Sequence, residues 1–325
     1  MAEIGGGHPW EQLKLTCEIR NEAPRQMWRG AAVGHGSLSY FRSEDVLAYD
    51  LEKNTWNELP KCPQIECQLA VIGNFLTAVG GLSGGQETNC LSSFNGGKWV
   101  TIFPPMPTKR RWHTVISAQN YLIAAGGRGE EDVPLSTVEV MDCSTLKWHT
   151  AASLPEPAYL MSATVCGGNL YLLGGRTWSQ PKQSSPWRQN LDSTHAVFTC
   201  TLDSLLQSCH PPSQTPSCAS EASVWQRVTN LPVRGSSCTT LNGRVLAVGG
   251  EDSHGDPTAL VHMYDCESNS WLVLGNVSTA RSWCHVVSLR DCIITVGGIM
   301  QTAAQTTTLE VGYLQLSGGG CICSV

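Results

Sequence analysis

The stretch Leu246-Ala247-Val248-Gly249-Gly250 decides the fold, because its pattern, a short apolar run that ends in two glycines, recurs along the chain. Further copies end at Gly81, Gly127, Gly175 and Gly298, and a weaker copy, AAVGHG, contains Gly34 and Gly36. The first glycines lie at positions 34, 80, 126, 174, 249 and 297, so the successive intervals are 46, 46, 48, 75 and 48 residues. A period of roughly 40–50 residues is typical of repeats that each form a small four-stranded sheet.

Aromatic residues follow the glycine pairs in phase. Tyr49 and Tyr264 lie fifteen residues after the first glycine of their copies, and Trp56 and Trp271 lie seven residues further on. Tight-turn sequences such as Asn242-Gly243 stand between two apolar runs before a glycine pair, where hairpins require positive φ. Each copy therefore predicts four antiparallel strands, a to d, with a tight a–b turn, a variable b–c loop and a Trp on strand d.

The glycine pair, the aromatic residue and the Trp together resemble the kelch repeat. The resemblance implies an all-β fold, a six-bladed β-propeller, which spans residues 1–317 and leaves residues 318–325 as a flexible tail. The long fourth interval predicts surface insertions in blade four at about residues 176–195 and 203–223, both rich in Ser, Pro and Gln.

The N-terminal segment HPWEQLKL, residues 8–15, is expected to close the ring. Trp10 lies 24 residues before Gly34, as Trp56 lies 24 residues before Gly80. Blade six has no Trp after the strand that contains Tyr313, so the N-terminal strand is expected to pair with that strand. Closure would also protect a strand edge that an open blade exposes.

One face of the ring is the expected binding face. The strand order places the b–c loops and the d–a connections between blades on the same face, and the a–b and c–d turns on the other. The first set is longer and more variable, and binding residues concentrate on loops that a rigid scaffold holds.

Arginine, tryptophan and serine gather on these loops. Arg is suited to bidentate capture of carboxylate or phosphate, and Trp and Arg are enriched in binding hot spots. The resemblance implies that, as in kelch substrate receptors, the loops hold a short peptide of a partner protein, which could carry an acidic motif. The predicted partner-binding residues are Arg110, Arg111, Trp112, Arg128, Arg176, Arg234, Ser236, Arg281 and Trp283.

Three alternatives stay open. The arginines could instead pair with carboxylates such as Glu130, Glu131 or Glu251. The chain could be a propeller enzyme, copper oxidase-like or sugar epimerase-like, because some propellers of this repeat type are enzymes. It has no room for the BTB and BACK regions through which many kelch proteins recruit a cullin ubiquitin ligase, so a link to a ubiquitin ligase stays undecided.

Composition excludes several classes of protein. With 41% apolar and 15% charged residues the chain can bury a large core, and its net charge of −6 argues against nucleic acid as a partner. No apolar run approaches the ~20 residues of a membrane span, and no secretion signal precedes the repeats. The 15 cysteines are therefore expected as reduced thiols in a cytoplasmic protein without cofactor or metal.

Overall fold

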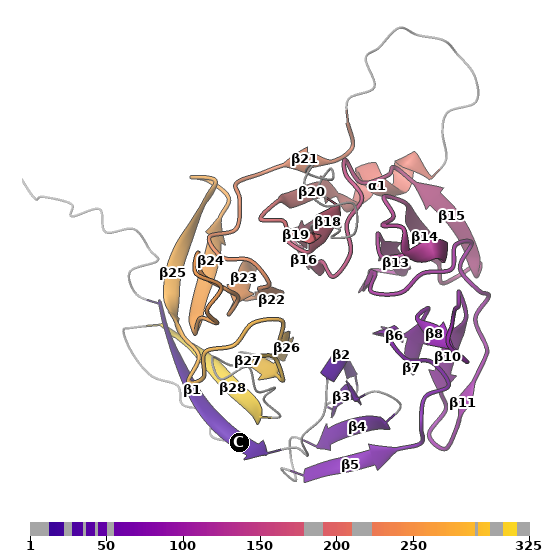
Figure 1. The fold of residues 1–325 in the computed structure, drawn as a ribbon, viewed down its shortest axis with the longest axis horizontal. Helices are drawn as coiled ribbons and strands as arrows, with labels where there is room; N and C mark the ends of the chain where they lie inside the picture. Colours follow the sequence, from indigo (N-terminus) through magenta and orange to yellow (C-terminus); the bar gives the residue numbers. More distant parts are fainter. Residues whose placement is uncertain are drawn as a thin grey trace, which may run out of the picture.

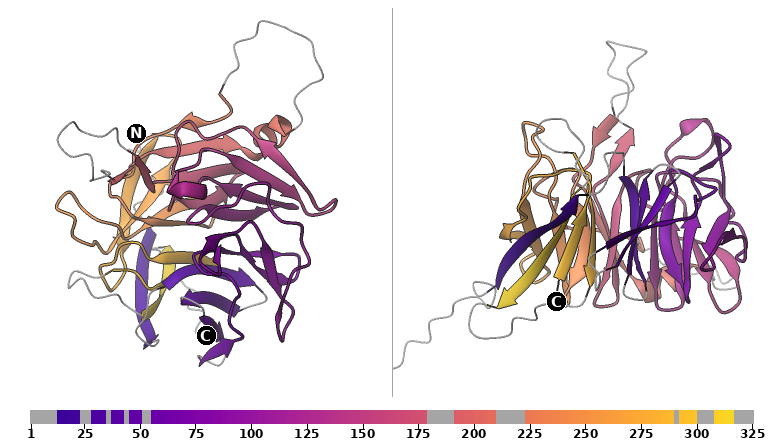
Figure 2. Two further views of the ribbon diagram at one scale, coloured as in Figure 1. Left: turned by 45° about the vertical axis from the view of Figure 1, so that its right-hand side comes forward. Right: turned by 90° about the horizontal axis from the view of Figure 1, so that it is seen from below.

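The computed structural model describes residues 13–22, 28–34, 37–42, 45–50, 55–178, 191–209, 223–289, 292–299 and 308–316. This part of the chain contains six four-stranded antiparallel sheets. Figure 1 shows the sheets arranged around a common centre, each with its strands stacked outward from that centre. The right-hand view of Figure 2, turned by 90° from Figure 1, shows the sheets standing side by side with their strands roughly upright.

Each sheet is built from strands that are close in the sequence. The first sheet contains β2 (Trp28–Gly34), β3 (Ser37–Arg42), β4 (Asp45–Asp50) and β5 (Thr55–Leu59). The second contains β6 (Gln68–Ile72), β7 (Phe75–Val79), β10 (Leu91–Phe94) and β11 (Trp99–Val100). The third contains β12 (Thr114–Ala118), β13 (Tyr121–Ala125), β14 (Val138–Asp142) and β15 (Lys147–Ala151).

The remaining three sheets follow the same plan. The fourth contains β16 (Ser162–Cys166), β17 (Asn169–Leu173), β20 (Val197–Thr201) and β21 (Gln226–Arg227). The fifth contains β22 (Ser237–Leu241), β23 (Arg244–Val248), β24 (Leu260–Asp265) and β25 (Ser270–Asn276). The sixth contains β26 (His285–Leu289), β27 (Cys292–Val296), β28 (Thr308–Leu316) and, from the other end of the chain, β1 (Leu13–Glu22).

The innermost strand of every sheet is its first strand, and these strands contact one another in sequence around the centre: β2 with β6, β6 with β12, β12 with β16, β16 with β22, β22 with β26, and β26 with β2. The N-terminal strand β1 pairs with β28, with Thr16 opposite Tyr313 (Figure 2). The paired strand includes the last three residues of the stretch 8–15, with Leu15 opposite Leu314, and continues to Glu22; Trp10 lies outside the described residues.

The first sheet differs from the expected strand assignment. The AAVGHG stretch was expected to end the second strand, but Gly34 ends the innermost strand β2, and β3 follows at Ser37. Only two residues separate β3 from β4, so this copy has no long b–c loop. The interval from Gly34 to Tyr49 therefore contains the strand β3, whereas the same interval in other copies contains the b–c loop. Gly34 ends the first strand of its sheet and Gly80 follows the second strand of its sheet, so the equal distances from Trp10 to Gly34 and from Trp56 to Gly80 do not lead to equivalent strands.

The glycine pairs are required because neighbouring sheets approach the backbone closely at these positions. Gly249 has φ of 64°, and a Cβ there would lie 2.2 Å from the carbonyl oxygen of Arg281 in the connection that leads to the next sheet. Gly126 has φ of 61°, and its Cβ would lie 2.3 Å from the carbonyl oxygen of Ala158. Backbone N–H groups of the second glycines, Gly127 and Gly250, donate to these same carbonyls at 2.8 and 2.9 Å. Glycine thus joins the third and fifth sheets to their neighbours.

The repeated Trp residues attach the outer strands to the connection that leads to their sheet from the preceding one. The indole N–H groups of Trp99, Trp148 and Trp225 donate to backbone carbonyls of the preceding connection, at 2.7, 3.1 and 2.9 Å. The apolar core is accordingly divided into clusters that lie between adjacent sheets. The largest joins the third and fourth sheets and includes Val140, Leu170 and Trp225.

The described parts of the insertions of the fourth sheet contain regular structure, while residues 179–190 and 210–222 lie outside the described part of the chain. In the first insertion β18 (Arg176–Trp178) pairs with β19 (Leu191–Ser193). In the second, helix α1 (Leu202–Ser208) begins directly after β20, and the Thr201 side chain caps it by accepting from the Ser204 N–H at 3.0 Å. Leu205 of this helix is 0% exposed, so the helix contributes to the core rather than lying loosely on it.

Candidate functional site

A cavity of about 570 Å³ lies among the innermost strands of the second to sixth sheets. Residues at and just before the beginning of the innermost strand line it in the second to sixth sheets, and in the third to sixth sheets the residue directly after the glycine pair lines it too. Both parts lie on the face that carries the d–a connections and the b–c loops, which is the expected binding face. Of the predicted partner-binding residues, Trp112, Arg128, Arg176, Ser236 and Trp283 line this cavity.

One repeat position, fourteen residues before the first glycine of a pair, contributes a residue to the cavity from each of five sheets. These rim residues are Glu66, Trp112, Leu160, Gly235 and Trp283, with φ of 54°, 51°, 55°, 65° and 54°. Positive φ is unfavourable for a residue with a side chain, and such residues cluster at functional sites. The sequence indicated Trp112 and Trp283; the same count from Gly80 and Gly174 would have found Glu66 and Leu160.

Trp112 stands in a stack of arginines and aromatic rings. The Arg111 guanidinium lies 4.1 Å from the centre of the Trp112 ring, and that of Arg128 lies 5.6 Å from it and 4.6 Å from the centre of Tyr159. Trp112 and Tyr159 are themselves stacked, with ring centres 6.1 Å apart. Cation–π contacts of this kind orient the guanidinium groups over the aromatic faces.

Arg111 and Arg128 both form ion pairs with carboxylates. Arg111 donates to Glu66 at 2.8 Å and to Asp132 at 2.6 Å, and Arg128 donates to Asp132 at 2.7 Å. Burial alone would lower the pKa of Arg111, but the carboxylates of Glu66 and Asp132 raise it, so its charge is secure. Of these side chains Glu66 and Arg128 line the cavity, and both arginines are ion-paired rather than free cations.

The opposite wall contains a second stack. The Arg176 guanidinium lies 4.8 Å from the centre of the Trp283 ring, and the Trp283 indole N–H donates to Glu251 at 2.8 Å. Glu251 also accepts from Nε of Arg234 at 3.0 Å. Arg234 is therefore held by a carboxylate at the edge of the site, which is the structural alternative considered for it.

Hydroxyl groups and one histidine complete the lining. Ser236 lines the cavity and donates to the Gly249 carbonyl at 3.0 Å, and Thr114, Ser162 and Ser237 also line it. Burial lowers the pKa of His285 to about 4, so this imidazole is neutral near pH 7.

Arg110 and Arg281 were predicted to face a partner, and the structure corrects this. Both side chains are 0% exposed. Arg110 donates to the Gly126 carbonyl at 2.8 Å and pairs with Glu139 at 3.0 Å, and Arg281 donates to the Gly297 carbonyl at 2.9 Å. Each arginine thus holds the first glycine of its own pair from sixteen residues away, and neither can reach a ligand in the cavity.

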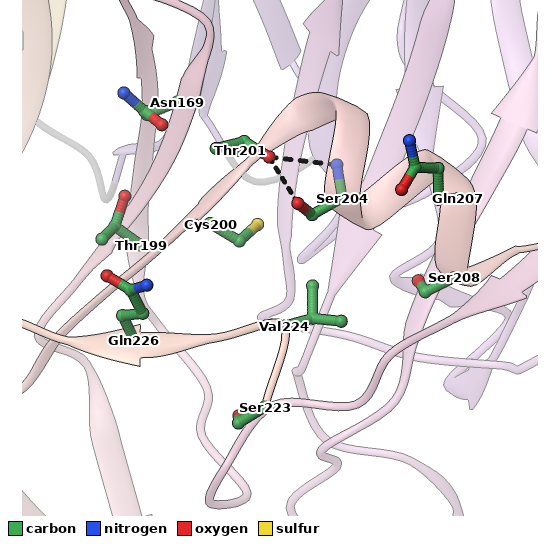
Figure 3. A pocket seen from close by; sticks show the side chains of 10 residues that line it. All are labelled: Asn169, Thr199, Cys200, Thr201, Ser204, Gln207, Ser208, Ser223, Val224 and Gln226. Carbon is green, nitrogen blue, oxygen red and sulfur yellow. Dashed lines mark hydrogen bonds between the residues drawn. The ribbon is translucent and has the colours of Figure 1, made fainter. Parts of the chain in front are cut away.

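A second cavity, of about 460 Å³, lies at the outer edge of the fourth sheet beside α1 (Figure 3). Its lining is uncharged and consists of hydroxyl, amide and apolar side chains together with Cys200. Burial raises the pKa of the Cys200 thiol to about 12, so the thiol stays protonated. This cavity offers no ionised group for chemistry.

The described residues contain neither a metal-binding cluster nor a membrane-spanning helix. They contain no group of three or more His, Cys, Asp and Glu side chains that could hold a metal ion. None of the helices placed by the structure is both long and apolar enough to cross a membrane.

Comparison with known proteins identifies the repeat. The Kelch motif family model matches residues 109–155 and 232–278. The chain is 25% identical to mouse (Mus musculus) Kelch-like protein 35 over 67% of its own length and 41% of the relative. It is 24% identical to rat (Rattus norvegicus) Kelch-like protein 36 over 79% of its own length and 40% of the relative. The chain thus spans about two fifths of these relatives.

Two further similarities extend this picture. Alpha-scruin of Limulus polyphemus is 24% identical over 64% of this chain and 21% of its own length. The solved structure of YjhT superposes on 91% of this chain and 99% of its own with a TM-score of 0.68 and 14% identity. At that identity the likeness concerns the fold alone.

Proposed function

This chain belongs to the kelch-repeat family, and we propose that it is a protein-interaction module that binds a peptide or loop of a partner protein in its central cavity. In this proposal the six sheets are the blades of one propeller, closed by the pairing of β1 with β28. The partner-binding residues are those that reach the cavity or its mouth: Arg111, Trp112, Arg128, Arg176, Arg234, Ser236 and Trp283.

The observation that carries the proposal is the convergence of the rim residues. Each of five sheets contributes to one cavity a residue with positive φ, and four of these five residues are not glycine. A strained backbone persists only where the surrounding structure imposes it, and clustered strain marks a site that is used. The aromatic and cationic side chains at this site are those enriched in binding hot spots. An acidic motif in the partner fits the arginines that line the cavity, Arg128 and Arg176. Substrate recognition for a ubiquitin ligase is a narrower form of the proposal.

A matched pair of leucines tests this function. Leu160 lies at the rim with φ of 55°, and Leu146 lies in the β14–β15 turn on the opposite face with φ of 57°. Leu160→Arg would place a long charged side chain in the mouth of the cavity, whereas Leu146→Arg places the same side chain on the far face. Both variants carry the same change at the same backbone conformation.

Affinity capture of the tagged protein from cell extract, followed by mass spectrometry, is the measurement. We expect partners of the wild-type protein to be retained by Leu146→Arg and lost by Leu160→Arg, with the melting temperatures of both variants close together. Retention of the same partners by Leu160→Arg would contradict binding in the cavity.

A further inference from the structure

Two cysteines meet in the connection that leads from β5 to β6. The thiol of Cys67 lies within hydrogen-bonding reach of the thiol of Cys62, and neither cysteine is part of a disulfide. Both side chains are buried in the same apolar cluster, which also contains Leu69 and Ala78. Between the cysteines Glu66, with φ of 54°, bends the chain. The connection thus holds two thiols together without a bond between them.

The repeat does not require this pair of cysteines. In the next copy, 46 residues later, the equivalent positions are Thr108 and His113. Among the five copies with a glycine pair, only the one that follows this connection has cysteine at both positions. The meeting of Cys62 with Cys67 is therefore a feature of this connection and not of the fold.

The apolar surroundings limit the chemistry that the pair can support. Burial, followed by the contact with Cys62, raises the pKa of the Cys67 thiol well above its usual range. A charged product, such as two thiolates on a metal ion, would meet the same cost of burial. A disulfide carries no charge, and two thiols that are already in contact reach its sulfur–sulfur distance of about 2 Å by a small movement. The site therefore favours the disulfide over a charged complex.

We propose that Cys62 and Cys67 form an oxidation site, at which a peroxide converts the two thiols into a disulfide that locks the β5–β6 connection. One sulfur attacks an oxygen of hydrogen peroxide, the O–O bond breaks, and a sulfenic acid and a water form. The other thiol gives up its proton and attacks the sulfenic sulfur, so that the S–O bond breaks and a second water leaves. The pair of thiols thus loses two electrons and two protons to one peroxide. This modification is independent of what the central cavity binds.

The locked connection positions part of the cavity lining. Gln64, between the two cysteines, donates through Nε2 to the carbonyls of Gly80 and Cys90, both at 2.8 Å. Glu66 lines the cavity and accepts from Arg111 at 2.8 Å. A disulfide closes residues 62–67 into a ring and removes local motions in which the connection opens. Oxidation is therefore expected to slow hydrogen exchange of the backbone amides in this segment.

Burial also decides which thiols react first. A thiol attacks as its thiolate, and a buried thiol of raised pKa ionises mainly when its segment opens. Cys90 and Cys266 are exposed, whereas Cys62 and Cys67 are buried. An alkylating reagent is therefore expected to modify the exposed pair in the folded protein and to leave the buried pair unmodified. This difference allows exposed thiols to be blocked before oxidation.

Peptide mapping after this block is the test. The full chain is treated with N-ethylmaleimide under native conditions, freed of reagent, exposed to hydrogen peroxide, and unfolded in a heavier maleimide. It is then digested, without reduction, by a protease that cleaves after glutamate. Cleavage at Glu58, Glu66 and Glu87 places the two cysteines in separate peptides, 59–66 and 67–87. We expect peroxide to join these two peptides by a disulfide and to abolish labelling of both cysteines by the heavier maleimide.

Serine variants identify the thiols that take part. In Cys62→Ser and in Cys67→Ser the joined peptides should disappear. Cys90→Ser, which removes an exposed cysteine from the loop before β10, should leave them unchanged. Hydrogen–deuterium exchange of residues 62–67 should become slower after peroxide in the wild-type protein and in Cys90→Ser, and should not change in Cys62→Ser.

Three results of the mapping would overturn the proposal: a disulfide from either cysteine to a different one, sulfinic acid in place of the disulfide, or full labelling of both cysteines after peroxide. The last result would mean that the two thiols only fill the core. Formation of the disulfide with unchanged amide exchange would refute the locking of the connection. If either serine variant fails to fold, the map of the wild-type protein decides by itself.

Discussion

Replacing Gly249 by alanine should destabilise the fold far more than replacing Gly243, although both glycines have similar backbone conformations. Their φ values are 64° and 69°. A left-handed conformation costs alanine about 1–2 kcal/mol at either position. At Gly243 nothing lies within 4 Å of the added Cβ, so this cost is the whole effect, whereas at Gly249 the Cβ would lie 2.2 Å from the carbonyl oxygen of Arg281.

The additional cost at Gly249 follows from the contact between sheets. The same Arg281 carbonyl accepts the N–H of Gly250 at 2.9 Å, so moving it away leaves a buried donor without its partner. That loss contributes about 1–3 kcal/mol beyond the backbone cost. We therefore expect Gly249→Ala to lower the free energy of unfolding by about 2–5 kcal/mol, against about 1–2 kcal/mol for Gly243→Ala.

Urea denaturation followed by tryptophan fluorescence measures both free energies under the same conditions. The comparison depends on the difference between the two variants, so any effect of alanine on the unfolded chain cancels. Equal destabilisation of Gly249→Ala and Gly243→Ala would show that the close approach of the sheets contributes nothing, and would refute this explanation of the glycine pairs.

Three further predictions concern buried groups. Arg110→Met should cost about 3–5 kcal/mol because it leaves Glu139 buried without its partner, and a loss below about 1 kcal/mol in urea denaturation would contradict the structural role of Arg110. Leu205→Ala should cost about 2–5 kcal/mol by the same measurement, because its side chain is buried, and a negligible change would place α1 outside the core. His285, whose pKa is about 4 in the fold, should destabilise the protein as the pH falls from about 6.5 toward 4, because the unfolded chain takes up a proton there first. His285→Gln should flatten that loss in denaturation curves at pH 7 and pH 5, and an unchanged pH dependence would contradict it.

The strands of the second to sixth sheets were predictable because their signals are local. A glycine pair reports a positive φ and a close backbone contact, and a Trp at a constant distance reports the outer strand. The strands of the first sheet were assigned wrongly because an equal number of residues between Gly34 and Tyr49 was taken to mean an equal order of strands. With only two residues between β3 and β4, the same interval contains a strand in place of a loop.

The cavity was predictable as a location and only partly in its chemistry. Counting back from the glycine pairs identified Trp112 and Trp283, and the residues after the pairs identified Arg128 and Arg176. Glu66 and Glu251 were missing from the predicted site, although each occupies a repeat position equivalent to one that was identified.

Three consecutive residues show where sequence reasoning ends. Arg110 is buried and forms an ion pair with Glu139. Arg111 donates to Glu66 and Asp132, and Trp112 lines the cavity. The repeat pattern determined that a d–a connection of this kind would exist and on which face it would lie, because glycine, turn and strand preferences act over a few residues. Which cation is neutralised and which stays open depends on carboxylates 45 and 21 residues away from Arg111, and only the packing of the sheets brings such groups within bonding distance.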